Sequence, residues 1–435
     1  MIDPRRVLRD RKMKWDQWFI VSLCVAINFI DGYDIISLAV AAPVLAREWT
    51  LSPGTLGFLF SAGLIGMSIG ALLISPCADI FGRRPAIMGA LVLMAVGMAL
   101  CASSPGPGLL ALGRVITGIG MGGMTSTAGT LAMEYSSANR RELSVGLVVI
   151  GYPVGSVLGS SLAILLLQYF TWHSIFWGGA LLAALLLPLI AWRLPESLEF
   201  LLSRQPVGAL AKVNKVLDRL GIATLDALPP RKAEGVGREG LARFLEPAML
   251  RRVMRVCAGQ AANMFSWYFI FNWATKWVAE MGLSDSAGIS FSLSISIGGV
   301  AGGLAAGALA ANIGLRKVTT LSLVGVAACI ILFSLMPPSL PMLTVLALVL
   351  GAVLFASAAS IYSTIALAYP PQMRATGAGI ASTAGRVGAI FGPLTAGLLR
   401  DEGLSIALIC LLLAIPALLS AAIFWGTPRD ATVHD

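Results

Sequence analysis

Charged residues are scarce in this sequence. Only 12% of its 435 residues are Asp, Glu, Lys or Arg, whereas 57% are hydrophobic. A soluble globular domain carries about a quarter charged residues, so the composition excludes that class. Apolar stretches long enough to cross a bilayer follow one another along the chain. The composition therefore predicts a polytopic membrane protein.

Histidine and cysteine are also scarce, with two and six residues, respectively. The cysteines stand singly, mostly within apolar runs, and form no C-x-x-C pair or metal-ligand spacing. We therefore expect neither a metal site nor another cofactor. The sequence also lacks the H-E-x-x-H motif of metalloproteases and the glycine-rich loop that binds nucleotide phosphates. These absences argue against an enzyme.

Twelve apolar segments are long enough to span the membrane, since about 20 residues cross the hydrocarbon core. Six precede and six follow a polar segment over 194–250, where we expect a cytoplasmic linker with the short helices ESLEFLLSR and GALAKVNKVLDRL. The predicted fold is all-α, with pseudo-symmetric six-helix halves at 1–193 and 251–435. The predicted spans lie at about 17–45, 55–79, 85–104, 108–134, 143–169, 172–193, 252–279, 286–312, 317–336, 341–368, 374–399 and 403–425.

Basic residues concentrate on one side of these spans. With the N-terminus inside, 26 of the 31 Lys and Arg residues fall in inner loops and tails, and three fall outside. This asymmetry is the positive-inside pattern, so we expect both termini and the linker in the cytoplasm. It also explains the net charge of +9 without a surface patch for nucleic acid.

The two halves resemble each other in sequence. GALLISPCADIFGRR at 70–84 ends the second span, and GLAAGALAANIGLRK at 303–317 ends the eighth, so that Arg83 aligns with Arg316. A repeat of two six-helix halves is typical of transporters that bind their substrate near mid-membrane, between the repeats. Because that pathway lies within one chain, a monomer would suffice for function.

Three motifs connect the chain with a known family. GALLISPCADIFGRR resembles the loop signature G-x(8)-D-x-x-G-R-[RK] of the major facilitator superfamily. LGRVITGIGMGG in the fourth span resembles its R-x-x-x-G-x-G motif, and PESLEFL after the sixth span resembles its P-E-S segment. The resemblance covers nearly the whole chain. It implies a secondary transporter that works by alternating access.

Two further motifs narrow the resemblance. DGYD at 31–34 is similar to the D-G-x-D signature of the aromatic acid:proton symporter family, and YPPQMRATGAGIASTAGRVGAIFGP at 369–393 is similar to that family's motif in span eleven. The resemblance implies proton-driven import of an aromatic carboxylate, such as a hydroxybenzoate, across a bacterial inner membrane. A proton-driven exporter, a sugar importer and a carrier of another organic anion stay open as alternatives.

Two acidic residues lie within the first span. Asp31 and Asp34 are three residues apart and share one helix face. A carboxylate in the bilayer core is costly unless it is protonated or paired, so we predict that one of them carries the coupled proton, with a slight preference for Asp31. Arg114 lies at a similar depth in span four, which predicts an Asp34–Arg114 pair. The resemblance to the superfamily implies that Arg114 takes part in proton coupling with these aspartates. A permanent ion pair that only holds helices together is the alternative.

A basic residue lies deep in span eleven. Arg386 is twelve residues beyond Arg374, or about 18 Å at ~1.5 Å per residue. Because a guanidinium group matches a carboxylate with two hydrogen bonds, we predict that Arg386 anchors the substrate carboxylate; a standing bridge to an aspartate of span one is the alternative. The stretch QAANMFSWYFIFNW at 260–273 offers rings and amides for the substrate ring, although aromatic residues also face lipid. The further substrate-binding candidates are Asn28, Tyr33, Asn263, Phe265, Trp267, Tyr268, Asn272 and Tyr362.

The loop after span two is predicted to form a gate. A carboxylate at a helix end can pair with arginines across the cytoplasmic mouth, and a glycine permits the tight turn between the helices. A static charged loop that only enforces topology is the alternative. The gating candidates are Asp79, Gly82, Arg83 and Arg84, with a companion charge cluster of Glu134, Arg140 and Arg141.

Small residues recur at helical spacing in several spans. Such residues let two helices approach closely, and we expect them to serve packing and rocking rather than substrate contact. These residues are Gly66 and Gly70, then Gly151, Gly155 and Gly159, and finally Gly388 and Gly392.

Overall fold

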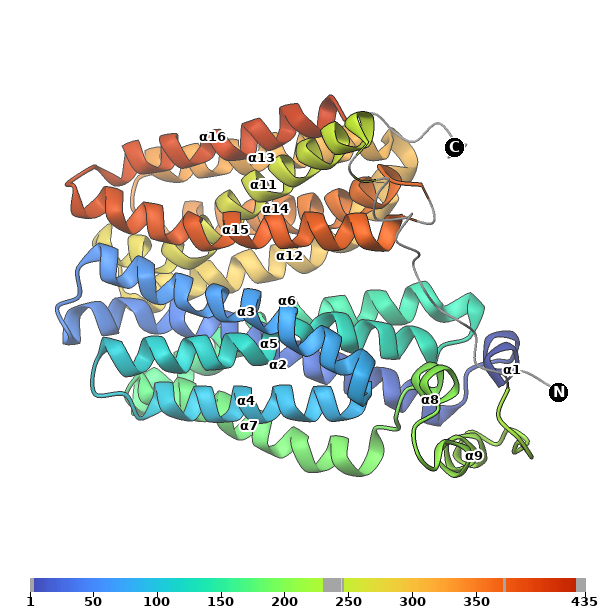
Figure 1. The fold of residues 1–435 in the computed structure, drawn as a ribbon. Coiled ribbons are helices and arrows are strands. Elements are labelled where there is room, and N and C mark those ends of the chain that lie inside the picture. The colour runs from blue at the N-terminus through green and yellow to red at the C-terminus, as the bar shows by residue number, and fades with distance from the viewer. Residues whose placement is uncertain (1–3, 230–243, 245, 371–372, 428–435) are drawn as a thin grey trace. The chain divides into compact units, whose positions relative to one another are not determined.

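The computed structural model describes residues 4–229, 244, 246–370 and 373–427, and every regular element in this part of the chain is a helix (Figure 1). The all-α prediction is confirmed. Twelve of the described helices have 20 residues or more: α2 (Trp15–Glu48), α3 (Pro53–Phe81), α4 (Arg83–Ala102), α5 (Pro107–Glu134), α6 (Arg141–Tyr169), α7 (His173–Arg193), α11 (Pro247–Glu280), α12 (Asp285–Ile313), α13 (Leu315–Leu335), α14 (Leu340–Leu367), α15 (Arg374–Asp401) and α16 (Ile406–Trp425).

Each predicted span falls on one of these long helices. Ten of the twelve are both long and apolar enough to cross a membrane. The other two, α11 and α15, have sufficient length at 34 and 28 residues, but they carry more polar side chains. Four shorter elements complete the described chain: α1 (Pro4–Asp10), η1 (Ala138–Arg140), α8 (Leu198–Arg204) and α9 (Ala209–Arg219).

The linker contains the two short helices that its sequence predicts. ESLEFLLSR corresponds to α8, and GALAKVNKVLDRL corresponds to α9. Ser197 caps α8 by accepting a hydrogen bond from the Phe200 amide at 3.0 Å. Residues 230–243 and 245 of the predicted linker lie outside the described residues.

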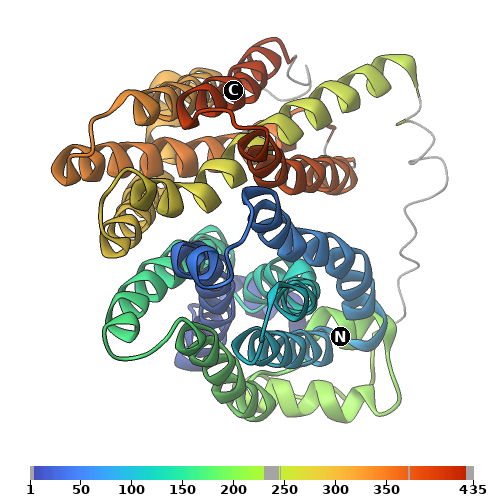
Figure 2. The same ribbon diagram turned by 90° about the vertical axis from the view of Figure 1, so that its left-hand side faces the viewer.

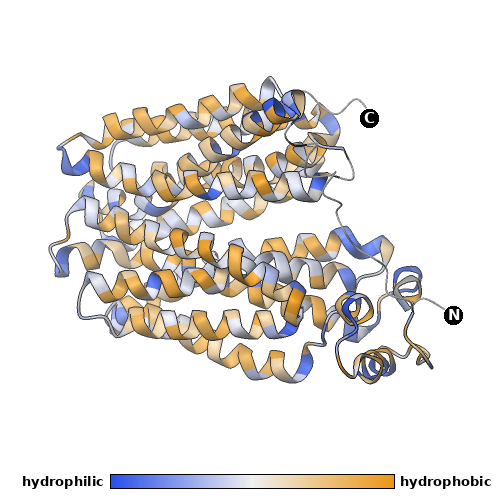
Figure 3. Cartoon of the chain, viewed as in Figure 1, coloured by the Kyte–Doolittle hydropathy of each residue, from blue (hydrophilic) through white to orange (hydrophobic). Residues whose placement is uncertain are grey.

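Apolar residues dominate the long helices, and polar residues gather near the helix ends (Figure 3). Large apolar side chains are exposed along the spans; Leu72 and Leu321, for example, are 69% and 61% exposed. In water, such surfaces would favour aggregation. In a bilayer they face lipid, as the composition predicts.

The described chain divides into two compact units. Their boundary runs through α2, α3 and α6, so these helices contribute to both units. The division into halves at 1–193 and 251–435 stays a prediction. Unit 1 comprises Met1–Ile35, Gly66–Gly159 and His173–Gly235, and unit 2 comprises Ile36–Ile65, Ser160–Trp172 and Val236–Asp435.

Glycines bring the helices of unit 1 into close contact. A Cβ atom added to Gly70 in α3 would lie 2.0 Å from the Ile119 carbonyl oxygen of α5. One added to Gly155 in α6 would lie 2.0 Å from the Phe29 carbonyl oxygen of α2. Only glycine permits backbones to approach this closely, so the packing role predicted for these small residues is confirmed.

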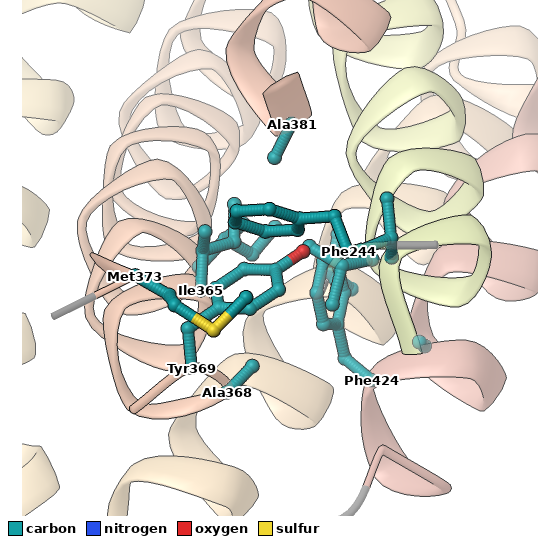
Figure 4. Packing of buried hydrophobic residues seen from close by; sticks show 12 residues of the cluster. Phe244, Ile365, Ala368, Tyr369, Met373, Ala381 and Phe424 are labelled. Atoms are coloured by element: carbon teal, nitrogen blue, oxygen red, sulfur yellow. The ribbon is translucent and has the colours of Figure 1, made fainter. Parts of the chain in front are cut away.

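The helices α11 to α16, coloured yellow-green to red in Figure 2, form the bundle of unit 2. A Cβ atom added to Gly388 in α15 would lie 1.9 Å from the Ala261 carbonyl oxygen of α11. Close-packed apolar side chains fill one end of the bundle (Figure 4). There the ring of Phe244 packs against Tyr369 with centroids 6.0 Å apart, near Met373 and Phe424.

Unit 2 also includes the segment Ile36–Ile65, which joins the ends of α2 and α3. Ser61 Oγ donates to the Ile390 carbonyl oxygen of α15 at 2.7 Å. The Phe60 ring meets the Trp273 ring of α11 edge to face, with centroids 5.7 Å apart. This segment is therefore packed directly on α11 and α15.

The internal repeat is visible in two turns. Gly82 separates α3 from α4 with φ of 109°, and Gly314 separates α12 from α13 with φ of 89°. Positive φ values favour glycine, because a Cβ atom strains this backbone conformation. At Gly82 a Cβ atom would also lie 2.3 Å from the Glu196 carboxylate. The predicted turn role of Gly82 is therefore confirmed.

Candidate functional site

Asp34 and Arg114 form the ion pair that their depths predict. Arg114 Nη1 of α5 donates to Asp34 Oδ1 of α2 at 2.8 Å, and it also lies 3.3 Å from the Asp34 carbonyl oxygen. The Arg114 side chain is 4% exposed and the Asp34 side chain 0%. A charge-assisted hydrogen bond in such a dry environment is strong. It joins two helices of unit 1.

Asp31 lies on the same side of α2, next to a different residue of α5. Thr125 Oγ1 donates to Asp31 Oδ2 at 2.6 Å. Asp31 is 2% exposed, and its other oxygen, Oδ1, has no hydrogen-bond partner among the described residues. Within the same part of the chain, no basic side chain forms an ion pair with Asp31. The two aspartates therefore differ: one is neutralised by an arginine, and the other is bonded only to a hydroxyl group.

Sequence reasoning missed Thr125. Thr125 and Arg114 are eleven residues apart, which is close to three helical turns, so both lie on the face of α5 that meets the two aspartates. That spacing was the available signal. The threonine could not be singled out from the sequence, because hydroxyl groups, unlike charges, are common in membrane helices.

The two polar neighbours of the aspartates are bonded within unit 1. Asn28 Nδ2 donates to the Val148 carbonyl oxygen of α6 at 2.7 Å. Tyr33 is 1% exposed, packs with Met98 and Ala180, and donates its hydroxyl to the Ile175 carbonyl oxygen of α7 at 2.7 Å. Both side chains therefore join helices in this conformation, although Asn28 Oδ1 has no hydrogen-bond partner among the described residues and could be engaged without displacing a bond.

In unit 2, three helices bring together Arg386, Tyr268 and Tyr362. Arg386 of α15 lies close enough to Tyr268 of α11 and Tyr362 of α14 for electrostatic interaction with both. It is the thirteenth of the 28 residues of α15, consistent with the predicted depth. Tyr362 is 54% exposed. A cation and two phenol rings thus share one neighbourhood, which suits an aromatic anion.

The helix α11 also carries buried polar residues. Asn263 and Trp267 are buried, and Asn263 Nδ2 and Trp267 Nε1 have no hydrogen-bond partner in the described part of the chain. The same holds for Oε1 of the buried Gln260, which sequence reasoning missed. Gln260, Asn263 and Trp267 follow an i, i+3, i+7 spacing, so they lie on one helix face. Buried polar atoms without partners are costly, so this helix face is a candidate for hydrogen bonding to a ligand.

The remaining candidates on α11 have local roles. Trp267 stacks on Phe271 with centroids 4.7 Å apart. Asn272 Nδ2 donates to the Tyr268 carbonyl oxygen at 2.7 Å, one turn earlier on the same helix. Phe265 is half-buried, and its carbonyl oxygen lies against Gly392 of α15. Of the predicted set on α11, Tyr268 is the residue for which an electrostatic interaction with Arg386 is described.

A hydrogen-bonded charge network lies where α4 begins, α5 ends and the linker starts. Arg83 Nη1 pairs with Glu134 Oε1 at 2.7 Å, and Ser197 Oγ donates to Glu134 Oε2 at 2.6 Å. Glu196 Oε1 accepts the Arg83 amide at 2.8 Å and the Arg84 amide at 3.2 Å. Glu196 thereby supplies the capping acceptor that Gly82, at the N-cap of α4, cannot.

Not all predicted gating residues join this network. Asp79 is exposed and forms no ion pair within the described residues. Arg140 is exposed in η1, and Arg141 Nε donates to the Met133 carbonyl oxygen at 3.2 Å. The cluster around Glu134 is therefore built with Arg83 and the P-E-S segment. The gating role of all seven residues stays a prediction.

Tyr135 ties the network to the N-terminal end of α2. Its hydroxyl donates to the Glu196 carbonyl oxygen, and its own carbonyl oxygen accepts Gln17 Nε2 at 2.7 Å. Burial, together with the neighbouring carboxylates, raises the pKa of Tyr135 well above its usual range. The phenol thus stays a neutral donor.

Among the described residues, no group of three or more His, Cys, Asp or Glu side chains is placed to hold a metal ion. The polar sites consist instead of carboxylate, guanidinium, amide and hydroxyl groups. Such groups suit protons and organic anions.

Comparisons with known proteins identify the family. The sequence model described as Major Facilitator Superfamily matches residues 24–304 and 256–434. The chain is 30% identical over 431 residues to the gallate transporter of Pseudomonas putida, covering 97% of this chain and 94% of the relative. It is 30% identical over 432 residues to the 4-hydroxybenzoate transporter PcaK of Acinetobacter baylyi, with the same coverage. It is 28% identical over 429 residues to the benzoate transport protein of Acinetobacter baylyi, covering 96% and 91%.

Solved structures agree on the fold. The xylose transporter XylE of Escherichia coli, in a partially occluded inward open conformation, aligns with a TM-score of 0.75 at 16% identity, covering 97% of this chain and 100% of that one. Such low identity supports the fold alone. The family model and the curated relatives are those of transporters, so the expectation that the chain is not an enzyme is confirmed. The chain belongs to the Major Facilitator Superfamily and is a multi-pass secondary transporter related to carriers of aromatic acids.

Proposed function

We propose that this transporter imports an aromatic monocarboxylate together with protons. The observation that carries the proposal is the position of Arg386, midway along α15 and within electrostatic reach of Tyr268 and Tyr362. A charged residue at this depth marks a substrate or ion pathway in most membrane proteins. Relatives named for gallate, 4-hydroxybenzoate and benzoate support an aromatic acid as the substrate class.

Arg386 would bind the carboxylate. Its guanidinium group can donate two parallel hydrogen bonds to the two oxygens, and it stays charged throughout the transport cycle. The substrate ring would then lie against Tyr268 or Tyr362. The free polar atoms of Asn263 and Gln260 on α11 are a donor and an acceptor, respectively, so a ring hydroxyl could engage either.

Asp31 would carry the proton. Its carboxyl group is buried and bonded to Thr125, without an ionic partner among the described residues. Protonation removes an uncompensated charge there, and the proton can sit on the free Oδ1 oxygen. Asp34 would stay ionised beside Arg114. One proton and one monoanion together are neutral, so the pH gradient would drive import more than the membrane potential.

The transporter would function as a monomer in a bacterial inner membrane, with both termini in the cytoplasm. The charge asymmetry of the loops supports this orientation. The gate residues Arg83 and Glu134 would then lie at the cytoplasmic ends of α4 and α5.

Uptake by reconstituted protein tests this proposal. Purified protein in proteoliposomes with an imposed inward proton gradient is given radiolabelled gallate, 4-hydroxybenzoate, benzoate and, as a neutral comparison, xylose. We expect at least one of the acids to accumulate only with the gradient. Asp31→Asn and Arg386→Ala should each abolish accumulation.

Two variants serve as controls. Asp218→Asn removes an exposed carboxylate from α9, and Arg400→Ala removes a guanidinium group near the end of α15. Both should transport like the wild type. If no acid accumulates under an inward gradient, the importer proposal fails, and acid-loaded vesicles would then test export. Accumulation of xylose would contradict recognition of an anion.

A further inference from the structure

We propose that a basic cavity on the linker side of unit 1 binds the headgroup of an anionic phospholipid. The cavity has a volume of about 950 Å³. Its walls come from the adjoining ends of α3, α4 and α7 and from the linker helices α8 and α9. All of these segments belong to unit 1. The described residues that line the cavity do not include Asp31, Asp34 or any other residue of α2.

The charge of the lining is strongly positive. Arg84, Lys212, Lys215 and Arg219 contribute four basic groups, and Glu196 is the one acidic residue among the described residues that line the cavity. Glu196 is already engaged, since its carboxylate accepts the backbone amides at the start of α4. A net positive cavity of this size favours an anionic ligand.

Several of these groups have donor capacity to spare. Arg84 Nε and Arg219 Nη2 are buried, and neither has a hydrogen-bond partner among the described residues. Lys212 and Lys215 are exposed on α9, three residues apart, and neither forms an ion pair with any described residue. A phosphate group offers several acceptor oxygens and would satisfy such donors together. The two lysines supply mobile charges beside two guanidinium groups that are already held in place, that of Arg84 by the Ala191 carbonyl oxygen and that of Arg219 by Asp16 at 3.6 Å.

The cavity also has an apolar side. Phe81 and Trp192, at the ends of α3 and α7, are 67% and 73% exposed. The guanidinium group of Arg193 lies 4.2 Å from the centre of the Trp192 ring. Tryptophan beside arginine at the end of a membrane helix is typical of the interface between lipid tails and headgroups. The cavity therefore lies at the depth where a phospholipid has its phosphate.

This position favours a lipid over a soluble phosphate ester. The apolar residues Phe81, Met88 and Trp192 continue the surface of the spans, so acyl chains could extend along them while the phosphate meets the lysines. An anionic headgroup near basic side chains gains about 1 kcal/mol per residue, which is roughly a fivefold change in affinity each. The linker helix α9 would thereby be held at the membrane surface.

Native mass spectrometry of the full chain tests the proposal. Protein in neutral detergent is mixed with equal amounts of dioleoyl-phosphatidylglycerol and dioleoyl-phosphatidylcholine, and the retained lipids are counted. We expect preferential retention of phosphatidylglycerol by the wild type. The double variant Lys212→Gln/Lys215→Gln should lose this preference by at least about tenfold, and each single variant should lose part of it.

The control is Lys12→Gln/Lys317→Gln, which removes the same charge from exposed lysines outside the cavity and should retain the wild-type preference. Melting temperatures check that the variants fold. Equal lipid preference in the wild type and the Lys212→Gln/Lys215→Gln variant would overturn the proposal. A separate arm adds inorganic phosphate or glycerol phosphate at millimolar concentration. Full displacement of phosphatidylglycerol by either would assign the cavity to soluble phosphate or phosphate esters and refute the lipid assignment.

Discussion

The Asp34–Arg114 pair permits a quantitative test of the core of unit 1. The two groups are 2.8 Å apart, and their side chains are almost completely shielded from solvent. Removing one partner of a buried pair leaves an uncompensated charge and costs about 3–5 kcal/mol. Removing both partners costs much less, because no charge is left behind. We therefore predict that Arg114→Met destabilises the protein more than Asp34→Asn/Arg114→Met does.

Thermal unfolding in detergent measures the difference. For a unit of 150–250 residues, each kcal/mol shifts the melting temperature by about 2–4 °C, so the single variant should melt roughly 10 °C below the wild type. A dye that fluoresces on reaction with thiols suits this protein. Cys24, Cys101, Cys329 and Cys410 are buried and would react only as the chain unfolds.

The coupling between the two changes is the informative quantity. We expect the double variant to recover at least half of the loss caused by Arg114→Met. Asp218→Asn, which removes an exposed carboxylate, should melt like the wild type. If both single variants and the double variant melt within about 2 °C of the wild type, the pair contributes little and the reasoning from its burial is refuted.

Two more substitutions test neighbouring contacts. Thr125→Val removes the hydroxyl that donates to Asp31. It should slow gradient-driven uptake about tenfold, since a hydrogen bond to a charged group is worth about 1.5–3 kcal/mol. The control Thr127→Val removes a hydroxyl that bonds to its own helix and should leave uptake unchanged; equal uptake by the two variants would disprove the role of the Thr125–Asp31 bond. Gly388→Ala would place a Cβ atom 1.9 Å from a carbonyl oxygen of α11, and overpacking of this kind costs about 1–3 kcal/mol. The melting temperature of Gly388→Ala should therefore fall by several degrees. Gly379 has open space around it, so Gly379→Ala should melt like the wild type. Similar melting temperatures for the two variants would contradict the close packing of α11 and α15.

Much of the architecture could be predicted because the membrane makes charges expensive. Arg114 is one of few charged residues in the apolar spans, so depth alone matched it with Asp34, and the structure confirms the pair. The linker helices α8 and α9 were also predictable from their sequence pattern. Where charges are rare and the helical periodicity is strong, few arrangements of the helices are compatible with the sequence.

Contacts made by common residues could not be predicted in the same way. Tyr33 was a candidate for the substrate because it lies within the D-G-Y-D motif, but its ring points toward α7. The helical period explains this, since Tyr33 is about 200° around the helix from Asp31 at ~100° per residue. Glu196 illustrates a second difficulty. It caps α4 from more than a hundred residues away, and spacing along a helix carries no information on such long-range contacts.

The charge cluster near Glu134 illustrates a third difficulty. Sequence proximity suggested Arg140 and Arg141 as its partners, whereas the pair is formed by Arg83. The start of α4 and the end of α5 meet in unit 1, so Glu134 pairs with an arginine of another helix and not with the arginines that follow it in the chain. Local spacing therefore located the cluster but not all of its members.

The most direct test of the account is a measurement of proton movement during transport. Proteoliposomes with no imposed gradient and a pH-sensitive dye in the external medium are given one of the aromatic acids that accumulates. Import with protons predicts that the external medium becomes more alkaline in step with uptake, with about one proton per acid. Asp31→Asn should abolish the pH change, and Asp218→Asn should preserve it. Uptake of the acid without any pH change in the wild type would contradict proton symport, and a normal pH change in Asp31→Asn would contradict the role of Asp31.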